Sequence, residues 1–319
     1  MPWSDRVGSR LKLRDLRVFM AVANAGTMGR AAADLAVSQP VISKSIADLE
    51  DALGVRLFDR SRRGVELTGH GQSLRDSGIA VFDELRQSVT RLEALTDPTA
   101  GEIRIGTTVP LATGLVSAAL TRMAIQYPRM KFHVVEADLN TLRTRDLRAR
   151  NIDFAVARLL EPLSGDEFAA EVLFNDPYVV VVGRKSKWAR RRNVQLVDLV
   201  NERWVFPPIE PILALLRGAF EAAGLKLPRP DILTLSIQVH SNLLATGKFV
   251  TALPSSTLGW GADHLPFKAL PIVMPTTFAP VDIIALKGRT LSPAANLFLD
   301  CLRELVARRE KRKALMKAV

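Results

Sequence analysis

Three short helices are predicted at the start of the chain from the spacing of its apolar residues. Between residues 13 and 23 apolar side chains recur every three or four positions, the period of a helix with one buried face. An Ala-Gly pair ends this helix, and Thr27 is a suitable N-cap for a second, alanine-rich helix, MGRAAADLA. Ser38 can cap a third helix that carries Gln39 and Pro40 in its first turn, where the missing N–H of proline costs nothing.

The third predicted helix has an apolar side and a polar side. The apolar side of SQPVISKSIADLE (38–50) is formed by Val41, Ile42, Ile46 and Leu49. The polar side carries Gln39, Ser43 and Lys44. A core helix needs only the apolar side, so the polar side requires another explanation. Two short helices joined by a tight turn, the second with a polar outer face, indicate a helix-turn-helix.

A basic hairpin and one long helix are predicted next. Leu57-Phe58 and Val65-Leu67 flank the sequence SRRG, in which Gly64 suits a positive φ, so the segment is typical of a wing. Residues 69–96 form a long helical pattern capped by Thr68. Its heptad seams are Leu74, Val81, Ser88 and Leu95 on one position and Gly78, Leu85 and Leu92 on the other. We expect a dimer-forming helix, with packing on its own chain as the alternative.

Strand-like runs alternate with helical segments from residue 102 onward. The runs that read as strands are 102–109, 131–138, 153–159, 179–183, 204–208 and 281–288, and a helix ends the chain. This alternation predicts βαβ units and a parallel sheet. More than 200 residues of this pattern suit two lobes better than one. DPTAG (97–101) breaks the preceding helix and serves as a linker.

Composition indicates a folded protein without membrane segments. Of 319 residues, 48% are hydrophobic and 24% charged, which fits a globular chain. No apolar run is long enough to span a bilayer, and the N-terminus lacks the apolar centre of a signal peptide. The single cysteine, Cys301, excludes an internal disulfide framework and lies in an apolar helical pattern, so we expect it in the core. We therefore expect a cytoplasmic protein with no membrane partner.

The net charge of +11 is unevenly distributed. Residues 1–97 hold 14 Lys or Arg and 13 Asp or Glu, whereas the remaining residues hold 30 and 20. Much of the excess lies in RKSKWARRR (184–192) and RREKRKALMK (308–317), which we interpret as a solvated loop and tail whose roles stay open. Net charge therefore does not mark the N-terminal part as a nucleic-acid binder.

The N-terminal sequence resembles the DNA-binding domain of LysR-type transcriptional regulators. The resemblance covers residues 13–71 without a gap and includes AA-x-x-L, SQP-x-x-S, LE-x-x-LG-x-x-LF-x-R and LT-x-x-G. The downstream order is similar too, with G-x-F-V-x-x-LP (247–254) matching a second-lobe strand. One departure is RARNIDFAV, where family members usually have Gly before the Asp, so this loop is expected to differ locally. The subgroup that it resembles is that of galactose-binding-protein and aromatic-acid operon regulators.

The resemblance implies an all-α winged helix-turn-helix domain, a long linker helix and an α/β effector domain of two lobes, like a periplasmic binding protein. We assign residues 1–68 to the first, 69–97 to the second and 98–319 to the third. Within the effector domain, lobe I takes about 98–176 and 277–319, and lobe II about 177–276.

The polar side of the third helix is then expected to read DNA. Gln39 can pair with adenine N6 and N7, and Ser43 and Lys44 can reach a base or a phosphate. Pro40 and Val41 offer apolar contact to a thymine methyl. The remaining residues expected at DNA are Arg30 and Ser38, and the wing residues Arg60, Arg62 and Arg63.

The effector is expected between the lobes, as the resemblance implies. Thr107 and Thr108 precede a helix whose N-terminal amides favour an anion. Arg158 can pair with a carboxylate, so we expect a small organic anion as effector and no metal or cofactor. On the second lobe the candidates are Phe206, Pro207 and Ser236.

Catalysis and solute transport are the two alternatives to regulation. An enzyme is disfavoured because no nucleotide-binding, nucleophile-elbow or zinc motif occurs and the four histidines are scattered. A solute-binding transport protein is the second alternative, disfavoured by the fused DNA-binding motif. The regulator is expected to bind double-stranded DNA at an interrupted dyad as a dimer or homotetramer, and contact with RNA polymerase stays open.

Overall fold

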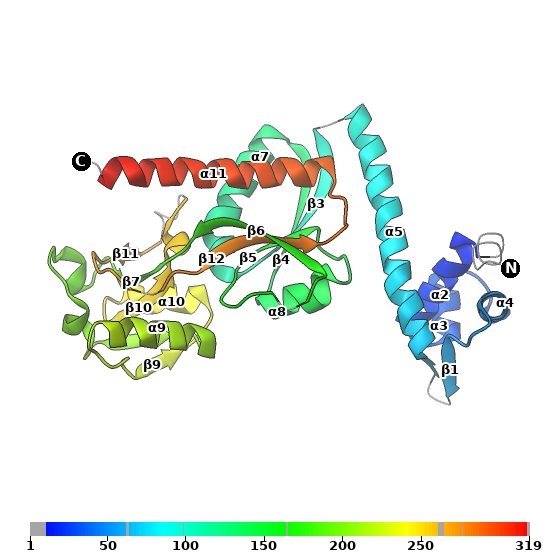
Figure 1. Cartoon of the computed structure of the whole chain (residues 1–319), viewed down its shortest axis with the longest axis horizontal. Coiled ribbons are helices and arrows are strands. Elements are labelled where there is room, and N and C mark those ends of the chain that lie inside the picture. Colours follow the sequence, from blue (N-terminus) through cyan, green and yellow to red (C-terminus); the bar gives the residue numbers. More distant parts are fainter. Residues whose placement is uncertain are drawn as a thin grey trace. The chain divides into compact units, whose positions relative to one another are not determined.

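The computed structural model describes residues 11–61, 64–97, 99–163, 165–260, 265–275 and 277–317. The chain forms two compact units, Met1–Arg86 and Gln87–Val319 (Figure 1). The boundary between the units falls inside the long helix α5 (Gly69–Thr96), not at either of its ends. The last part of this helix therefore belongs to the C-terminal unit.

Three helices and a hairpin precede α5 in the N-terminal unit. They are α2 (Leu13–Ala25), α3 (Met28–Asp34), α4 (Gln39–Leu53), β1 (Phe58–Ser61) and β2 (Gly64–Leu67). Phe19, Ile42 and Ile46 are fully buried at its centre. Two residues predicted on buried faces are instead exposed, Leu13 to 51% and Val41 to 40%, because each lies in the first turn of its helix.

The ends of these helices follow the predicted capping residues in two of three cases. The Thr27 hydroxyl accepts a hydrogen bond from the Arg30 backbone N–H at 3.2 Å, as predicted. The Thr68 hydroxyl likewise accepts one from Gly71 N–H at the start of α5. Ser38 occupies the N-cap position of α4, but its side chain makes no capping hydrogen bond.

The predicted wing is fixed against the helices. Gly64 has a φ of 134°, and a Cβ there would lie 2.4 Å from the carbonyl oxygen of Gly26, so the close approach requires glycine. The Val65 N–H donates to the same carbonyl at 2.9 Å. On the other strand, the Glu50 carboxylate accepts hydrogen bonds from the N–H groups of Leu57 and Phe58. The hairpin therefore has a defined position relative to the C-terminal end of α2 and to α4.

Lobe I contains a five-stranded sheet in the order β4-β3-β5-β12-β6. Its strands are β3 (Ala100–Thr107), β4 (Arg129–Glu136), β5 (Phe154–Arg158), β6 (Phe168–Asn175) and β12 (Pro280–Leu286). The helical segments are α6 (Val109–Leu111), η1 (Ala112–Val116), α7 (Ser117–Gln126), α8 (Leu139–Thr141), η2 (Leu142–Leu147) and α11 (Pro293–Lys317). Helices α7 and α11 cover one face of the sheet, and α8 with η2 covers the other (Figure 1).

Lobe II contains a second five-stranded sheet in the order β11-β7-β10-β8-β9. Its strands are β7 (Tyr178–Gly183), β8 (Arg203–Phe206), β9 (Pro230–Leu233), β10 (Phe249–Pro254) and β11 (Phe267–Ala269). The helical segments are η3 (Lys187–Arg190), η4 (Leu196–Leu199), α9 (Glu210–Ala222), α10 (Ile237–Ala245) and η5 (Ser255–Leu258). A core around Trp204 and Phe220 joins the sheet to α9.

The prediction of parallel sheets is only partly right. Strands β4, β3 and β5 are parallel, as are β10, β8 and β9, but β6, β12, β7 and β11 pair antiparallel with their neighbours. The reason is that the chain passes from one lobe to the other after β6 and returns before β12. The first strand after each passage, β7 in lobe II and β12 in lobe I, runs opposite to the parallel set.

The loop that departs from the family pattern contains a residue in an unusual conformation. Arg150 has a φ of 55°, in the left-handed region that glycine adopts freely. Its N–H and that of Asn151 bond to the carbonyls of Leu147 and Asp146, as at the end of a helix. The arginine therefore takes the conformation expected of a glycine, at a cost of roughly 1–2 kcal/mol.

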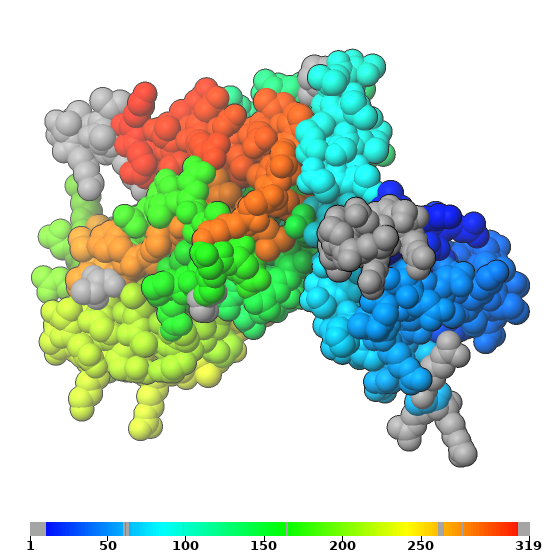
Figure 2. Space-filling view, turned by 45° about the vertical axis from the view of Figure 1, so that its right-hand side comes forward, coloured from blue at the N-terminus to red at the C-terminus, as the bar shows by residue number. Residues whose placement is uncertain are grey.

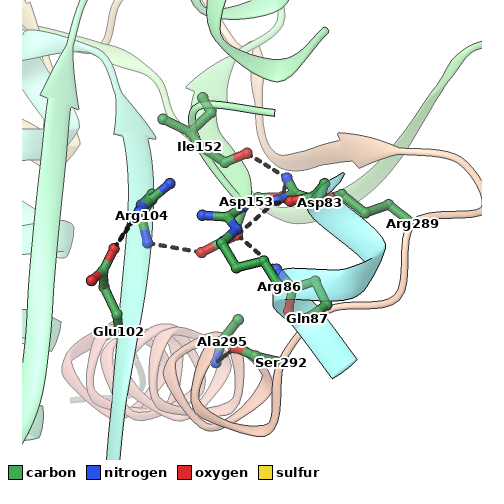
Figure 3. Close-up of polar contacts among 10 residues, drawn as sticks. All are labelled: Asp83, Arg86, Gln87, Glu102, Arg104, Ile152, Asp153, Arg289, Ser292 and Ala295. Atoms are coloured by element: carbon green, nitrogen blue, oxygen red, sulfur yellow. Dashed lines mark hydrogen bonds and ion pairs between the residues drawn. The ribbon is translucent and has the colours of Figure 1, made fainter. Parts of the chain in front are cut away.

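A buried polar network joins the end of α5 to lobe I within the C-terminal unit (Figure 3). Arg289 has no exposed side-chain surface and lies 2.9 Å from Asp153 Oδ1. The other oxygen of Asp153 accepts from the Arg104 N–H of β3 at 2.8 Å. Gln87 of α5 donates to Asp153 Oδ1 at 3.3 Å. One carboxylate thus holds a strand, a returning loop and the linker helix together.

Arg289 and Asp153 form a buried ion pair, and removing Arg289 leaves the Asp153 carboxylate without its counterion. Arg289→Met is therefore expected to lower the free energy of unfolding by about 3–5 kcal/mol. Chemical denaturation of the full chain, followed through the transition of the effector domain, measures the loss. The control is Arg303→Met, which removes an exposed partner of Glu171 and is expected to cost at most about 1 kcal/mol. Equal losses of unfolding free energy in both variants would contradict a stabilising role of the buried Arg289–Asp153 pair.

Candidate DNA interface and effector site

The first turns of α4 present a polar surface. Ser38, Gln39, Pro40, Val41 and Lys44 are all exposed, and Ser43 is half-buried. The opposite side of the helix is anchored by Ile42, Ile46 and Leu49. Because the buried residues fix the rotation of the helix, the side chains predicted to read bases project from one continuous face.

Helix α3 extends this surface. A Cβ placed on Gly29 would lie 3.7 Å from Gln39 Oε1, so the Gln39 side chain lies across the start of α3. Arg30, the next residue, is exposed. The structure thus brings together a hydrogen-bonding side chain suited to a base and a cation suited to a phosphate.

The wing residues are placed only in part. Arg60 lies in β1 opposite Val65, and β2 of the hairpin packs beside α2. Arg62 and Arg63 lie outside the described residues. Their expected contacts with DNA stay predictions.

Both lobes direct the carboxyl ends of their parallel strands toward the segments that connect them. In lobe I, β3 ends at Thr107 and β5 at Arg158, next to the crossover 175–178. In lobe II, β8 and β10 end at Phe206 and Pro254 on the edge where β7 begins. Ligands of α/β proteins commonly bind outside the carboxyl ends of such strands.

Asp176, which sequence reasoning missed, is the centre of the junction between the lobes. Its buried carboxylate accepts hydrogen bonds from the Ser255 hydroxyl at 2.8 Å, the Ser256 hydroxyl at 2.6 Å and the Ser256 N–H at 2.9 Å. Its own N–H donates to the Ala279 carbonyl of the second crossover. The only sequence signal is a lone Asp-Pro between two apolar strands.

Arg158 faces this carboxylate. Its guanidinium lies 3.9 Å from Asp176 Oδ2, donates to the Thr277 carbonyl at 2.9 Å and stands 4.4 Å above the Tyr178 ring. Burial raises the pKa of Tyr178 to about 12, so the ring stays neutral. Burial also lowers the pKa of Arg158, and its Nε and Nη1 have no hydrogen-bond partner among the described residues. Arg158 is thus already engaged by the protein but retains capacity for an anion.

Helix α11 reaches the same junction from lobe I (Figures 1 and 2). Arg309 donates to the Ser255 carbonyl at 3.0 Å, and its guanidinium lies 4.1 Å from the Trp260 ring. Trp260 itself has a φ of 53° and packs edge-on against Phe174 of β6. Three elements distant in sequence therefore meet around one serine.

Thr108 fits the predicted effector contact better than Thr107 does. Thr108 is half-buried at the N-cap position of α6, and its side chain makes no capping hydrogen bond. The helix begins at Val109, whose N–H lies beside Thr108; Pro110 has no N–H, and the N–H groups of Leu111 and Ala112 donate to the Thr108 carbonyl at 3.0 and 2.9 Å. Thr107 has no exposed surface, and its hydroxyl donates to the Thr108 carbonyl at 3.4 Å.

The residues predicted on lobe II do not form one group. Phe206 is fully buried and stacks on Trp204 at 5.1 Å, so the prediction that it lines the lobe surface is wrong: it is a core residue. Pro207 is half-buried. Ser236 is exposed and caps α10 by accepting from the Val239 N–H, so its hydroxyl is already used.

A second missed acid lies in lobe I. Asp282 pairs in register with Ala157, next to Arg158, and is buried. Its Oδ2 has no hydrogen-bond partner within the described part of the chain, and burial raises its pKa. The raised pKa favours the neutral carboxyl, which can donate a hydrogen bond as well as accept one. A single acid inside the apolar run VDIIAL was the available signal.

The described residues also bear on metal binding and on membrane insertion. No group of three His, Cys, Asp or Glu side chains there is placed to hold a metal ion. None of the helices in the described ranges has the length and apolar character needed to cross a membrane.

Comparison with known proteins assigns both units. Residues 13–72 match the "Bacterial regulatory helix-turn-helix protein, lysR family", and residues 96–307 match the "LysR substrate binding domain". The chain is 29% identical over 297 residues to the HTH-type transcriptional regulator GbpR of Azospirillum brasilense, a match that covers 92% of this chain and 86% of GbpR. It is 28% identical to the transcriptional dual regulator GltC of Bacillus subtilis, covering 94% and 99%.

Solved structures share the fold. A full-length OxyR variant from Pseudomonas aeruginosa matches with a TM-score of 0.62 at 21% identity, over 93% of this chain and 94% of that one. Full-length CbnR in complex with its target DNA matches with a TM-score of 0.54 at 23% identity, over 93% and 100%.

The raised pKa of Asp282 leads to a test of stability against pH. Its stabilising neutral form is fully present below the pKa of the unfolded chain and is lost as the pH rises through the raised folded pKa. Asparagine does not ionise, so Asp282→Asn does not lose stability in this way. The free energy of unfolding of the variant minus that of the wild type is therefore expected to increase from pH 4 to pH 8. Denaturant unfolding at several pH values measures the difference, and a pH-independent difference would contradict burial as the cause. Asp300→Asn, at an exposed acid, is the control.

Proposed function

Because the chain belongs to the LysR family of DNA-binding transcriptional regulators with an effector-binding domain, we propose that Gln39 reads a base in the major groove and that Arg30 binds the adjacent phosphate. The observation that carries this proposal is the exposed polar start of α4, with the Gln39 side chain beside α3. The apolar residues of the same helix fix its orientation.

The exposed apolar residues of α5 support self-association. Val81, Leu85, Leu92 and Leu95 lie on the predicted heptad seams and are all exposed. Exposed apolar side chains at such positions favour pairing with a second copy of the helix. Strands β4 and β9 are sheet edges that carry the exposed Val134 and Leu233, which suit a further contact between effector domains. A dimer binding an interrupted dyad, and a tetramer made of two such dimers, follow from these surfaces.

The effector is proposed to bind between the lobes and to change how they close. The junction around Asp176 is polar and buried, and the chain passes between the lobes only twice in its described part. Thr108, the N–H of Val109 and the Arg158 Nε and Nη1, which have no hydrogen-bond partner among the described residues, favour a small anion. Asp282 adds a donor for a neutral group. Such a ligand acts only if it binds two arrangements of the lobes with different affinity.

Regulation accounts for these features better than catalysis or solute transport. The polar groups in lobe I surround the junction at Asp176, where the chain passes between the lobes. Neither a catalyst nor a solute-binding protein requires the DNA-reading surface of α4. RNA polymerase is a proposed partner of the DNA-bound protein, as for any regulator that activates transcription.

The base-reading role is tested with Gln39→Ala. The loss of two hydrogen bonds to a base is expected to weaken binding to the selected operator by about 1–3 kcal/mol, with little change on random DNA. Selection of genomic fragments by purified wild-type protein supplies the operator, and titration against both duplexes measures the effect. Gln238→Ala, at an exposed glutamine of the effector domain, is the control. Equal losses on operator and random DNA would reject base reading.

The effector role of Thr108 is tested with Thr108→Val, which keeps the shape and removes the hydroxyl. The variant is expected to bind the operator normally but to lose the response to those small acids that alter the wild-type footprint. Thr121→Val removes an exposed hydroxyl of the same lobe and should respond as wild type does. A retained response in Thr108→Val would place the ligand elsewhere.

A further inference from the structure

Residues 184–192 (RKSKWARRR) form a basic segment on lobe II that none of the roles above uses. The segment contains six Lys or Arg residues and no Asp or Glu. It follows β7, includes η3 and leads to η4. All six cationic residues are exposed: Arg184, Lys185, Lys187, Arg190, Arg191 and Arg192.

The cations of this segment are solvated, as expected from the sequence, but its backbone is fixed to the lobe and includes the short helix η3. The Ser186 hydroxyl accepts from the Trp188 N–H at 3.3 Å and caps η3. Trp188 is 7% exposed and packs in the core of lobe II. Gly247 lies directly against the backbone of Lys185, where a Cβ would come within 3.0 Å. The backbone that carries the cations is therefore fixed on both sides.

The tryptophan also positions the charges. Lys187 Nζ and the guanidinium carbon of Arg191 each lie 5.0 Å from the centre of the Trp188 ring. Lys187 additionally pairs with Glu202 at 2.8 Å. Lys268 of β11 donates to the Ala189 carbonyl and adds a seventh cation to this surface. Because these side chains are held in place, less conformational entropy is lost when they bind a polyanion.

The chemistry of this surface fits phosphate. Guanidinium groups bind phosphates through two parallel hydrogen bonds, and duplex DNA presents one charge about every 1.7 Å along its axis. The chain already has a DNA-binding domain, but residues 1–97 are nearly neutral, with 14 basic and 13 acidic residues. The excess positive charge lies in the effector domain, where the helix-turn-helix does not account for it.

We propose that residues 184–192, together with Lys268, form a second, sequence-independent DNA contact that binds phosphates of the DNA flanking the operator. The proposal rests on the proposed function, because it requires the helix-turn-helix of the same chain to be bound to the operator. Once the helix-turn-helix is bound, the second contact is intramolecular, so weak phosphate interactions at high effective concentration add to the affinity.

The test compares two duplexes that contain the selected operator, one ending at the protected region and one extended on both sides. Full-length protein is titrated on each at several KCl concentrations. The test variant carries Lys185→Gln, Arg190→Gln and Arg192→Gln. The control variant carries Arg217→Gln, Lys226→Gln and Arg229→Gln, which removes the same charge from exposed residues outside the segment. Thermal unfolding confirms that both variants are folded.

On the extended duplex the wild type is expected to show a steeper dependence of log Kd on log salt, by about 0.9 for each additional phosphate that the protein neutralises. In the test variant the slope of log Kd against log salt on the extended duplex should be smaller by about 2–3, and binding to the short duplex should be unchanged. The control variant should show the same slope as the wild type. Equal slopes of wild type and test variant on the extended duplex overturn the proposal. The proposal is also overturned if the test variant binds DNA normally but no longer binds purified RNA polymerase. In that case the basic surface binds an acidic protein and not DNA. Failure of the wild type to prefer the short operator duplex over random DNA would instead reject the proposed function.

Discussion

The carboxylate of Asp176 is the group on which the arrangement of the effector domain depends. It is buried at the point where the chain leaves lobe I, and hydroxyl and amide donors from the start of η5, directly after β10, satisfy it. Two arginines of lobe I add positive charge nearby: Arg158 of β5 faces Asp176, and Arg309 of α11 contacts Ser255. A buried carboxylate that loses its donors is costly. Any movement of the lobes must therefore pivot at this group or replace its partners.

A second buried carboxylate, that of Asp153, joins the linker helix to lobe I. Asp153 and Arg289 hold Gln87, and with it the last turns of α5, to lobe I. Those turns belong to the same compact unit as the effector lobes. A rearrangement of lobe I consequently carries the end of α5 along, and α5 continues into the unit that bears the polar face of α4.

The sequence predicted features that depend on local pattern. Thr27, Thr68 and Gly64 were identified because caps and turns require particular residue types, and the family motifs identified the order of the domains. It did not predict the edge strand β6, whose side chains are mostly exposed, or the junction at Asp176, whose partners lie about 80 positions away. Phe206 was assigned to the wrong environment because an aromatic residue before prolines looks the same in a core and at a ligand. Contacts between distant segments leave no periodic signal.

The continuity of α5 across the two units has a geometric consequence. An α-helix turns by about 100° and advances about 1.5 Å with each residue. The number of residues between the first turn after Thr68 and the tether at Gln87 therefore fixes an angular phase as well as a length. A single insertion in this helix would therefore turn the residues after it by about 100° about the helix axis relative to the residues before it, and move them about 1.5 Å further along that axis.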